Sequence, residues 1–318
     1  MHPATRSRVT TLAALVVVAS SMVSACDRAR APAKPDTTHT TATPAVTESI
    51  TVARRSATLA WDSSAGPAML IRTDTLPLAA VLFPELADTL LLPDTLRFNP
   101  VGVRGAMVDL YSRGGRAGQA RIAKLEGLEW IGDAPTEWPA ASLDPVTPAS
   151  LPRWTVGLVA GRAEAIALDS IEGTTRADSA QLVAEVTRLA SALGNDTAAA
   201  FRGIPYAVRS AYRFTAAPGV HAVAAELVRH VPQEASPAVE HIFIVAERDS
   251  GVTTGRYHAA YFDRSSGPEE STESTDVLAA ITIGLPRRAA LVLERVGYES
   301  AAYTLLERIA KTWKVRWT

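Results

Sequence analysis

The stretch that decides the fold is VHAVAAELVRHVPQEASPAVEHIFIVAER, residues 220–248. It contains two strand-length runs, Val220–Val231 and Val239–Arg248, separated by a segment that begins at Pro232 and ends at Pro237. Proline cannot donate to a β-ladder and fixes its own φ angle, so a proline-bounded segment between such runs is typical of a loop between strands. This stretch therefore predicts two neighbouring antiparallel strands.

The same pattern of strand-length runs and turn segments continues on both sides. The turn signals include Pro218-Gly219 and Asp249-Ser250-Gly251, and they recur at strand spacing. We therefore expect a mainly β (α+β) protein with a meandering antiparallel sheet. The further predicted strands are Ala207–Thr215, Arg256–Arg264, Val277–Ile283, Ala290–Arg295, Ala301–Glu307 and Trp313–Trp317.

One amphipathic helix is predicted at about 177–193. Its apolar positions, which include Leu182, Val186 and Leu189, fall on one face. Thr175 with Asp178 resembles a capping box at the start, and Gly194-Asn195 supplies a stop. We expect this helix to cover a sheet rather than to bind a partner.

The region before the helix predicts a less regular set of strands, at Ala68–Arg72, Ala106–Tyr111 and Gln119–Leu125. Residues 112–118 are glycine-rich, but no helix pattern follows them as a phosphate-binding loop requires, so they predict a hairpin turn. A second hairpin is expected between Arg153–Ala160 and Ala163–Ser170, with Trp154, Val156 and Leu158 on one face of its first strand.

The first 26 residues have the order of an export signal. Arg6 and Arg8 give a positive start, and the apolar run Leu12–Val18 is too short to span a bilayer. The segment ends in Val23-Ser24-Ala25-Cys26, which resembles a bacterial lipobox. That resemblance implies cleavage between Ala25 and Cys26 and lipidation of the Cys26 thiol. Several acyl chains, at about 0.8 kcal/mol per buried methylene, would give a stable membrane anchor.

Cys26 is the only cysteine of the 318 residues. An intramolecular disulfide, a zinc–cysteine site and a thiol nucleophile are therefore excluded for the mature body. Cleavage would remove two arginines and leave a formal charge of −3, with 30 basic and 33 acidic residues. Such a near-neutral body does not have the basic surface expected of a nucleic-acid-binding protein, so no nucleic-acid partner is predicted.

The mature chain is expected to have three parts. Residues 26–49 are rich in Thr, Pro and Ala without an apolar period, which predicts a disordered tether. We place an N-terminal β-rich region at 50–173 and the helix with a C-terminal antiparallel region at 174–318. Together they are long enough to form one large β domain or two units.

The tail carries a partial family resemblance. Residues 276–317 combine an acid, a strand with Leu293-Glu294, a strand with Tyr303 and a strand ending in Trp317. This order resembles a degenerate FG-GAP or VCBS-type unit of β-propeller-like exported proteins, which would imply a calcium loop before the strand with Leu293-Glu294. The loop position holds Ile283–Arg288, with two cations and no carboxylate, so calcium binding is not expected there.

Candidate chemistry is sparse. His39 lies in the tether, His221 and His230 share a strand, and His241 and His258 could pair across a hairpin, but no zinc-ligand spacing is present. Asp62–Gly66 is the nearest approach to a nucleophile elbow and lacks its first glycine. The acidic stretch before residue 277 predicts a solvated connection between strands; its acids are Glu269, Glu270, Glu273 and Asp276. The six tryptophans predict core positions; they are Trp61, Trp130, Trp138, Trp154, Trp313 and Trp317.

No catalytic residue, metal ligand or cofactor site is predicted from these patterns. The leading hypothesis is a lipid-anchored protein of the bacterial envelope, at the cell membrane or outer membrane. Its body would be a non-enzymatic binding or structural module with an envelope protein or glycan as partner. The alternative is an envelope hydrolase acting on cell-wall or glycan material. A Ser–His contact or converging carboxylates in a pocket would favour the hydrolase.

Overall fold

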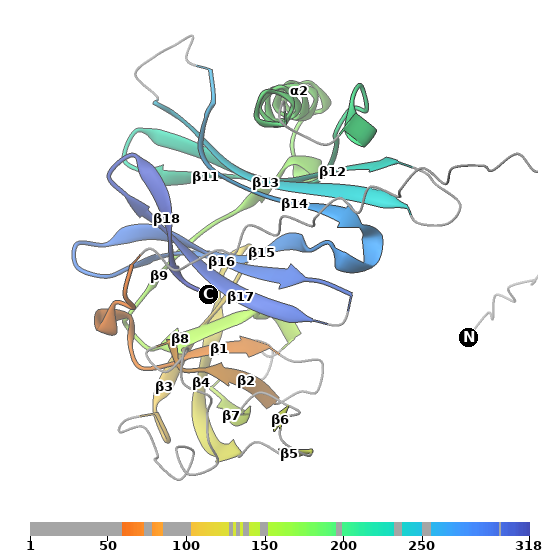
Figure 1. The fold of residues 1–318 in the computed structure, drawn as a ribbon. Helices are drawn as coiled ribbons and strands as arrows, with labels where there is room; N and C mark the ends of the chain where they lie inside the picture. Colours follow the sequence, from red (N-terminus) through yellow and green to blue (C-terminus); the bar gives the residue numbers. More distant parts are fainter. Residues whose placement is uncertain are drawn as a thin grey trace, which may run out of the picture. The chain divides into compact units, whose positions relative to one another are not determined.

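Antiparallel strands and a single α-helix make up most of the residues that the computed structural model describes (Figure 1). The predicted class, mainly β with one helix, is confirmed. The predicted signal, the Cys26 lipidation and cleavage site and the tether all lie outside the described residues. These are residues 59–72, 78–84, 103–126, 130–131, 134–135, 140–146, 152–194, 199–231, 237–249, 256–298 and 300–318.

Six strands close into a small barrel in the order β1-β2-β7-β4-β3-β8. Leu70, Val81, Leu110 and Ile122 pack together in one buried cluster at its centre. On β8 the inward position is Gly157, where a Cβ atom would lie only 3.3 Å from Leu70 and Leu110 side-chain atoms. The strands are β1 (Met69–Arg72), β2 (Leu78–Leu82), β3 (Met107–Ser112), β4 (Gly115–Glu126), β7 (Ala140–Pro145) and β8 (Val156–Val159).

Two five-stranded antiparallel sheets follow the barrel. The first sheet has the order β10-β11-β12-β13-β14 and the second the order β18-β17-β16-β15-β9. A two-stranded ribbon, β5 (Trp130–Ile131) with β6 (Ala134–Pro135), is separate. The sheet strands are β9 (Glu164–Ile166), β10 (Asp169–Ser170), β11 (Ala207–Ala217), β12 (Val220–Val231), β13 (Ala238–Asp249), β14 (His258–Pro268), β15 (Ser274–Ile283), β16 (Arg288–Val296), β17 (Ala301–Ile309) and β18 (Thr312–Trp317).

All eight strands predicted from residue 207 onward are present, but they form two meanders instead of one. The change of sheet occurs between β14 and β15, where the 3₁₀ turn η6 (Glu269–Ser271) redirects the chain. Two meanders can stack face to face and bury an apolar face of each, which a single sheet of this length cannot do.

The helix and the sheets are stacked in layers (Figure 1). One face of the first sheet packs against the helix, where Leu182 and Val186 meet Val223 and Ile244. Its other face packs on the second sheet through a second apolar cluster. The far face of the second sheet then packs against the outside of β1, β2 and β8 of the barrel.

The helix α2 spans Arg176–Leu193, close to the predicted 177–193. Thr175 Oγ1 accepts a hydrogen bond from the Asp178 amide at 3.2 Å and donates one to the Asp178 carboxylate at 2.9 Å. Gly194 is the C-cap. The prediction that this helix covers a sheet is confirmed.

The predicted hairpin of Arg153–Ala160 with Ala163–Ser170 is wrong. β8 pairs with both β1 and β3, and this closes the barrel and leaves no edge of β8 free. The next segment instead provides β9, which pairs with β15, and β10, which pairs with β11. The chain thus leaves the barrel near Gly161. Trp154 packs in the barrel interior, whereas Val156 and Leu158 pack toward the second sheet, so these three residues do not share a face.

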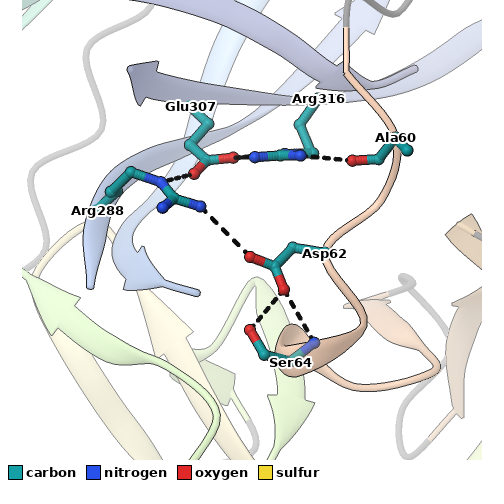
Figure 2. A network of polar contacts seen from close by, with 6 residues as sticks. All are labelled: Ala60, Asp62, Ser64, Arg288, Glu307 and Arg316. Atoms are coloured by element: carbon teal, nitrogen blue, oxygen red, sulfur yellow. Dashed lines mark hydrogen bonds and ion pairs between the residues drawn. The ribbon is translucent and has the colours of Figure 1, made fainter. Parts of the chain in front are cut away.

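A polar network fastens the segment before β1 to the second sheet (Figure 2). Fully buried Glu307 on β17 bridges Arg288 and Arg316. Arg316 donates to the Ala60 carbonyl at 2.6 Å, and Arg288 lies 3.4 Å from Asp62 Oδ2. Asp62 Oδ1 in turn accepts from the amide and hydroxyl of Ser64, so Asp62–Gly66 is a capped 3₁₀ turn rather than a nucleophile elbow.

Candidate functional site

Six carboxylates are buried among the described residues, and five of them are paired with arginine. Glu307 has the two arginines shown in Figure 2, and Asp263 on β14 pairs with Arg295 on β16 at 3.1 Å. The other three pairs are Asp109–Arg116, Glu240–Arg229 and Glu247–Arg308. The sixth carboxylate, Glu226, pairs with a histidine instead.

The Glu226–His241 pair lies at one end of the space between the two sheets. Glu226 on β12 follows Ala222 and Ala224 on the face that packs against the second sheet, and His241 on β13 shares that face with Phe243. The His241 Nδ1 atom lies 2.9 Å from Glu226 Oε1. Glu226 is only 1% exposed, and its Oε2 atom has no hydrogen-bond partner among the described residues.

Burial dominates the electrostatics of this pair. It raises the pKa of the Glu226 carboxyl, because the charged form loses its hydration. The hydrogen bond and charge of His241 act in the opposite direction, and so do the backbone amide of Thr275 and the charge of Arg209, but the net pKa shift remains upward. The fold thus holds a carboxyl group that accepts a proton more readily than an exposed glutamate does.

Ser265, His241 and Glu226 lie on three adjacent strands in the order of a serine–histidine–acid relay. Ser265 on β14 is directly opposite His241 in the strand register. The buried Ser265 Oγ accepts a hydrogen bond from the Glu273 amide at 3.0 Å. Within the described part of the chain, however, no hydrogen bond joins Ser265 to His241, so the link that activates a serine nucleophile is missing.

A polar hollow of about 230 Å³ opens on the surface beside this cluster. It lies between η6 and the connection from β16 to β17. Tyr298 in its lining is 78% exposed. The lining combines carboxylates, hydroxyls and one aromatic ring: Glu270, Ser271, Thr272, Glu273, Gly297, Tyr298 and Ser300. Such a surface can offer hydrogen bonds and a ring face to a polar ligand.

The acidic connection predicted at 263–276 is only partly a solvated loop. Glu269 and Glu270 are exposed, as expected. Asp263 is buried in β14, however, and Asp276 is in β15, where it pairs with Arg113 of the β3–β4 turn. The sequence pattern predicts that this strand ends at Arg264, four residues before the observed end of β14 at Pro268, because Ser265, Ser266 and Gly267 are not typical strand residues.

The remaining histidines do not converge on the pair. His221, His230 and His258 are exposed, and His39 lies outside the described residues. The predicted pairing of His241 with His258 is wrong, because the register places His258 opposite Glu247. In the parts of the chain that the structure describes, no group of three His, Cys, Asp or Glu side chains is placed to hold a metal ion.

The tryptophans behave mostly as predicted. Trp154, Trp313 and Trp317 are buried, Trp61 is partly buried, and the side chains of Trp130 and Trp138 lie outside the described residues. Trp313 faces the first sheet, but a register shift between Leu305 and Leu306 opposite β18 sends Trp317 to the core on the barrel side.

Residues 276–317 fall in the meander β15–β18, and the position that holds the calcium loop in the resembling units is a hairpin turn here. In this turn Arg287 lies 3.7 Å from Glu164, and Arg288 belongs to the Glu307 network. Comparison with known proteins found no matching family model, no matching curated protein and no matching solved structure. None of the described helices is both long and apolar enough to cross a bilayer.

The Glu226–His241 pair was missed by reasoning from sequence. One signal was present: Glu226 is the single acid within the apolar run Val223–Val228. A charged residue in such a run is buried only with a partner. That partner lies fifteen residues away and is brought near only by the register of β12 with β13.

Proposed function

We propose that this chain is an exported bacterial lipoprotein, anchored to the envelope membrane through lipid on Cys26, whose β-rich body is a non-enzymatic binding module. The observation that carries the anchor is the succession of Arg6, Arg8, the short apolar run Leu12–Val18 and Val23-Ser24-Ala25-Cys26. That the lipobox cysteine is the only cysteine supports a dedicated role for it.

The binding role is supported by the polar hollow. Its hydroxyls and carboxylates offer hydrogen bonds, and Tyr298 offers an exposed ring. An aromatic face beside hydrogen-bonding groups suits the apolar and polar faces of a sugar ring. We therefore place a hydroxyl-rich partner, such as an envelope glycan, at this surface.

The anchor is tested by following the precursor in cells fed a fatty-acid probe. Cys26→Ala should leave the precursor uncleaved and unlabelled, because alanine has no thiol for the lipid. Ser24→Ala is the matched control, since it keeps a small residue and should be cut and labelled normally. If Cys26→Ala is still acylated and processed, the lipoprotein proposal is wrong.

The binding role is tested by calorimetric titration of the mature lipoprotein in detergent with soluble cell-wall glycan fragments. Tyr298→Ala should weaken binding by about tenfold, the loss expected when about 1.4 kcal/mol of ring contact disappears. Leu285→Ala is the control, because Leu285 is also exposed but lies in the β15–β16 turn, outside the hollow. Absence of binding by the unaltered protein would contradict the glycan assignment.

The order Ser265–His241–Glu226 favours one second candidate, an envelope hydrolase. The missing Ser265–His241 hydrogen bond and the burial of Ser265 count against it. The two candidates differ in one measurement: a hydrolase would release product from cell-wall or glycan ester substrates and would lose this activity in Ser265→Ala. A binding module would show no turnover with either form.

A further inference from the structure

We propose that the Glu226–His241 pair is a proton-linked latch that controls the order of the segment Glu270–Thr275, whose residues 270–273 line the hollow. This regulatory role rests on the proposed binding function of the hollow. The latch itself is a property of the fold and can be measured without any ligand.

The choice of histidine as partner sets this pair apart. Arginine keeps its charge at every pH at which the protein is folded, so the five buried carboxylates with arginine partners stay paired. A neutral imidazole can still donate one hydrogen bond, but it no longer compensates the charge of Glu226. When Glu226 loses its proton, it becomes a buried carboxylate whose Oε2 atom has no hydrogen-bond partner among the residues that the structure describes.

A buried, uncompensated carboxylate is costly, and the structure lowers that cost by admitting water. Water can reach the pair from the side of His241, whose side chain is 16% exposed, whereas Glu226 is enclosed. Opening at this end of the two sheets would hydrate the carboxylate and leave the apolar core farther along β12 and β13 intact.

Two neighbouring residues, Thr275 and Ser265, lie between the pair and the segment 270–275. The backbone amide of Thr275 on β15 lowers the pKa of the Glu226 carboxyl. Ser265, opposite His241, accepts a hydrogen bond from the amide of Glu273, which lines the hollow. Movement of Glu226 and His241 is therefore transmitted to Glu273 and Thr275, which lie on either side of the start of β15.

The other charged groups that face the pair come from β11, β14 and β16. From β11, the exposed Arg209 favours the charged form of Glu226. From β14 and β16, Asp263 and Arg295 offset each other as an ion pair. The facing residues of β14 and β15, Ser265 and Thr275, are neutral.

The sign of the pH dependence follows from burial. Because burial raises the pKa of Glu226 above its usual 4.5, the folded state holds this proton more tightly than the unfolded chain. The stabilisation of the folded state by this proton is complete below pH 4.5 and is lost as the pH rises through the pKa of Glu226 in the folded state. The latch is thus closed in acid and opens toward alkaline pH.

Hydrogen exchange of the mature, full-length lipoprotein tests this. After correction for the intrinsic pH dependence of exchange, the protection of segment 270–275 should fall by about tenfold between pH 5 and pH 9. Glu226→Gln should abolish this change, because its amide oxygen still accepts from His241 but carries no charge. Glu270→Gln, an exposed acid of the same hollow, should retain it.

His241→Gln provides a second variant should Glu226→Gln fold poorly, because an amide donor can replace the hydrogen bond to Glu226 without carrying a charge. It should keep segment 270–275 protected at pH 5 and shift the loss of protection to higher pH, because the His241 charge that lowers the pKa of Glu226 is gone. Constant protection in the unaltered protein, or an undiminished pH response in Glu226→Gln, would overturn the latch. A pH response without glycan binding would refute the proposed function and leave the latch standing.

Discussion

The indole Nε1 of Trp313 donates a 2.7 Å hydrogen bond to Oε1 of Glu247 and so ties β18 of the second sheet to β13 of the first. Arg308 completes the arrangement with two bonds to the same carboxylate, at 2.7 and 2.9 Å. Trp313 also meets Phe214 edge to face, with ring centroids 5.9 Å apart. Glu247 therefore compensates a cation and an indole donor inside the apolar interface between the sheets.

Removal of Glu247 should be strongly destabilising. Glu247→Ala leaves the Arg308 guanidinium and the Trp313 indole N–H without their buried acceptor, and we expect the free energy of unfolding to fall by about 3–5 kcal/mol. Urea unfolding followed by tryptophan fluorescence measures this change. Glu185→Ala is the control, because it breaks a surface pair with Arg188 on α2 and should cost about 0.5 kcal/mol. Equal losses in the two variants would contradict the assigned role of Glu247.

The helix N-cap offers a milder test. Thr175→Ala removes the side-chain acceptor of the Asp178 amide, and the expected loss of stability is about 1 kcal/mol. Thr175→Ser keeps an acceptor at the same position and should be close to the unaltered protein. Thermal unfolding by circular dichroism separates the two. An alanine variant as stable as the serine variant would show that the cap does not contribute.

The sequence predicted the parts of the fold that depend on local pattern. The bounds of Val220–Val231 coincide with β12, and α2 begins within one residue of its predicted start, since Thr175, Asp178 and Gly194 are local signals. Both are determined by residues that are neighbours in the chain, and turn residues mark their ends.

Pairing over long distances could not be predicted in this way. The short strands β9 and β10 have no local signal that assigns them to different sheets, and their partners β15 and β11 are separated from them by intervening elements. The same limit applies to the candidate site. Glu226 and His241 are adjacent only because β12 and β13 pair in one particular register, and a shift by one residue would direct His241 to the opposite face.

Asp109 provides a pH-dependent test at the point where the chain leaves the barrel. Burial alone would raise the pKa of its carboxyl, but hydrogen bonds from the Gly161 amide, Gln119 and Arg116 outweigh this effect and lower the pKa below 3.8. A carboxyl whose pKa is lowered by folding stabilises the folded state at pH values above its pKa in the unfolded chain. This stabilisation is lost as the pH falls through the pKa of the carboxyl in the folded state. The stabilisation by Asp109 should therefore be complete near neutrality.

Asp109→Asn should reduce the free energy of unfolding by about 1–3 kcal/mol at pH 7, because the amide group cannot accept from all three donors. The difference from the unaltered protein should stay constant down to about pH 5 and shrink below the ordinary pKa of 3.8. Urea titrations over this pH range measure it, with the exposed Asp169→Asn on β10 as the control. If the Asp109→Asn difference were independent of pH, its cost would reflect altered packing rather than the loss of a stabilised charge.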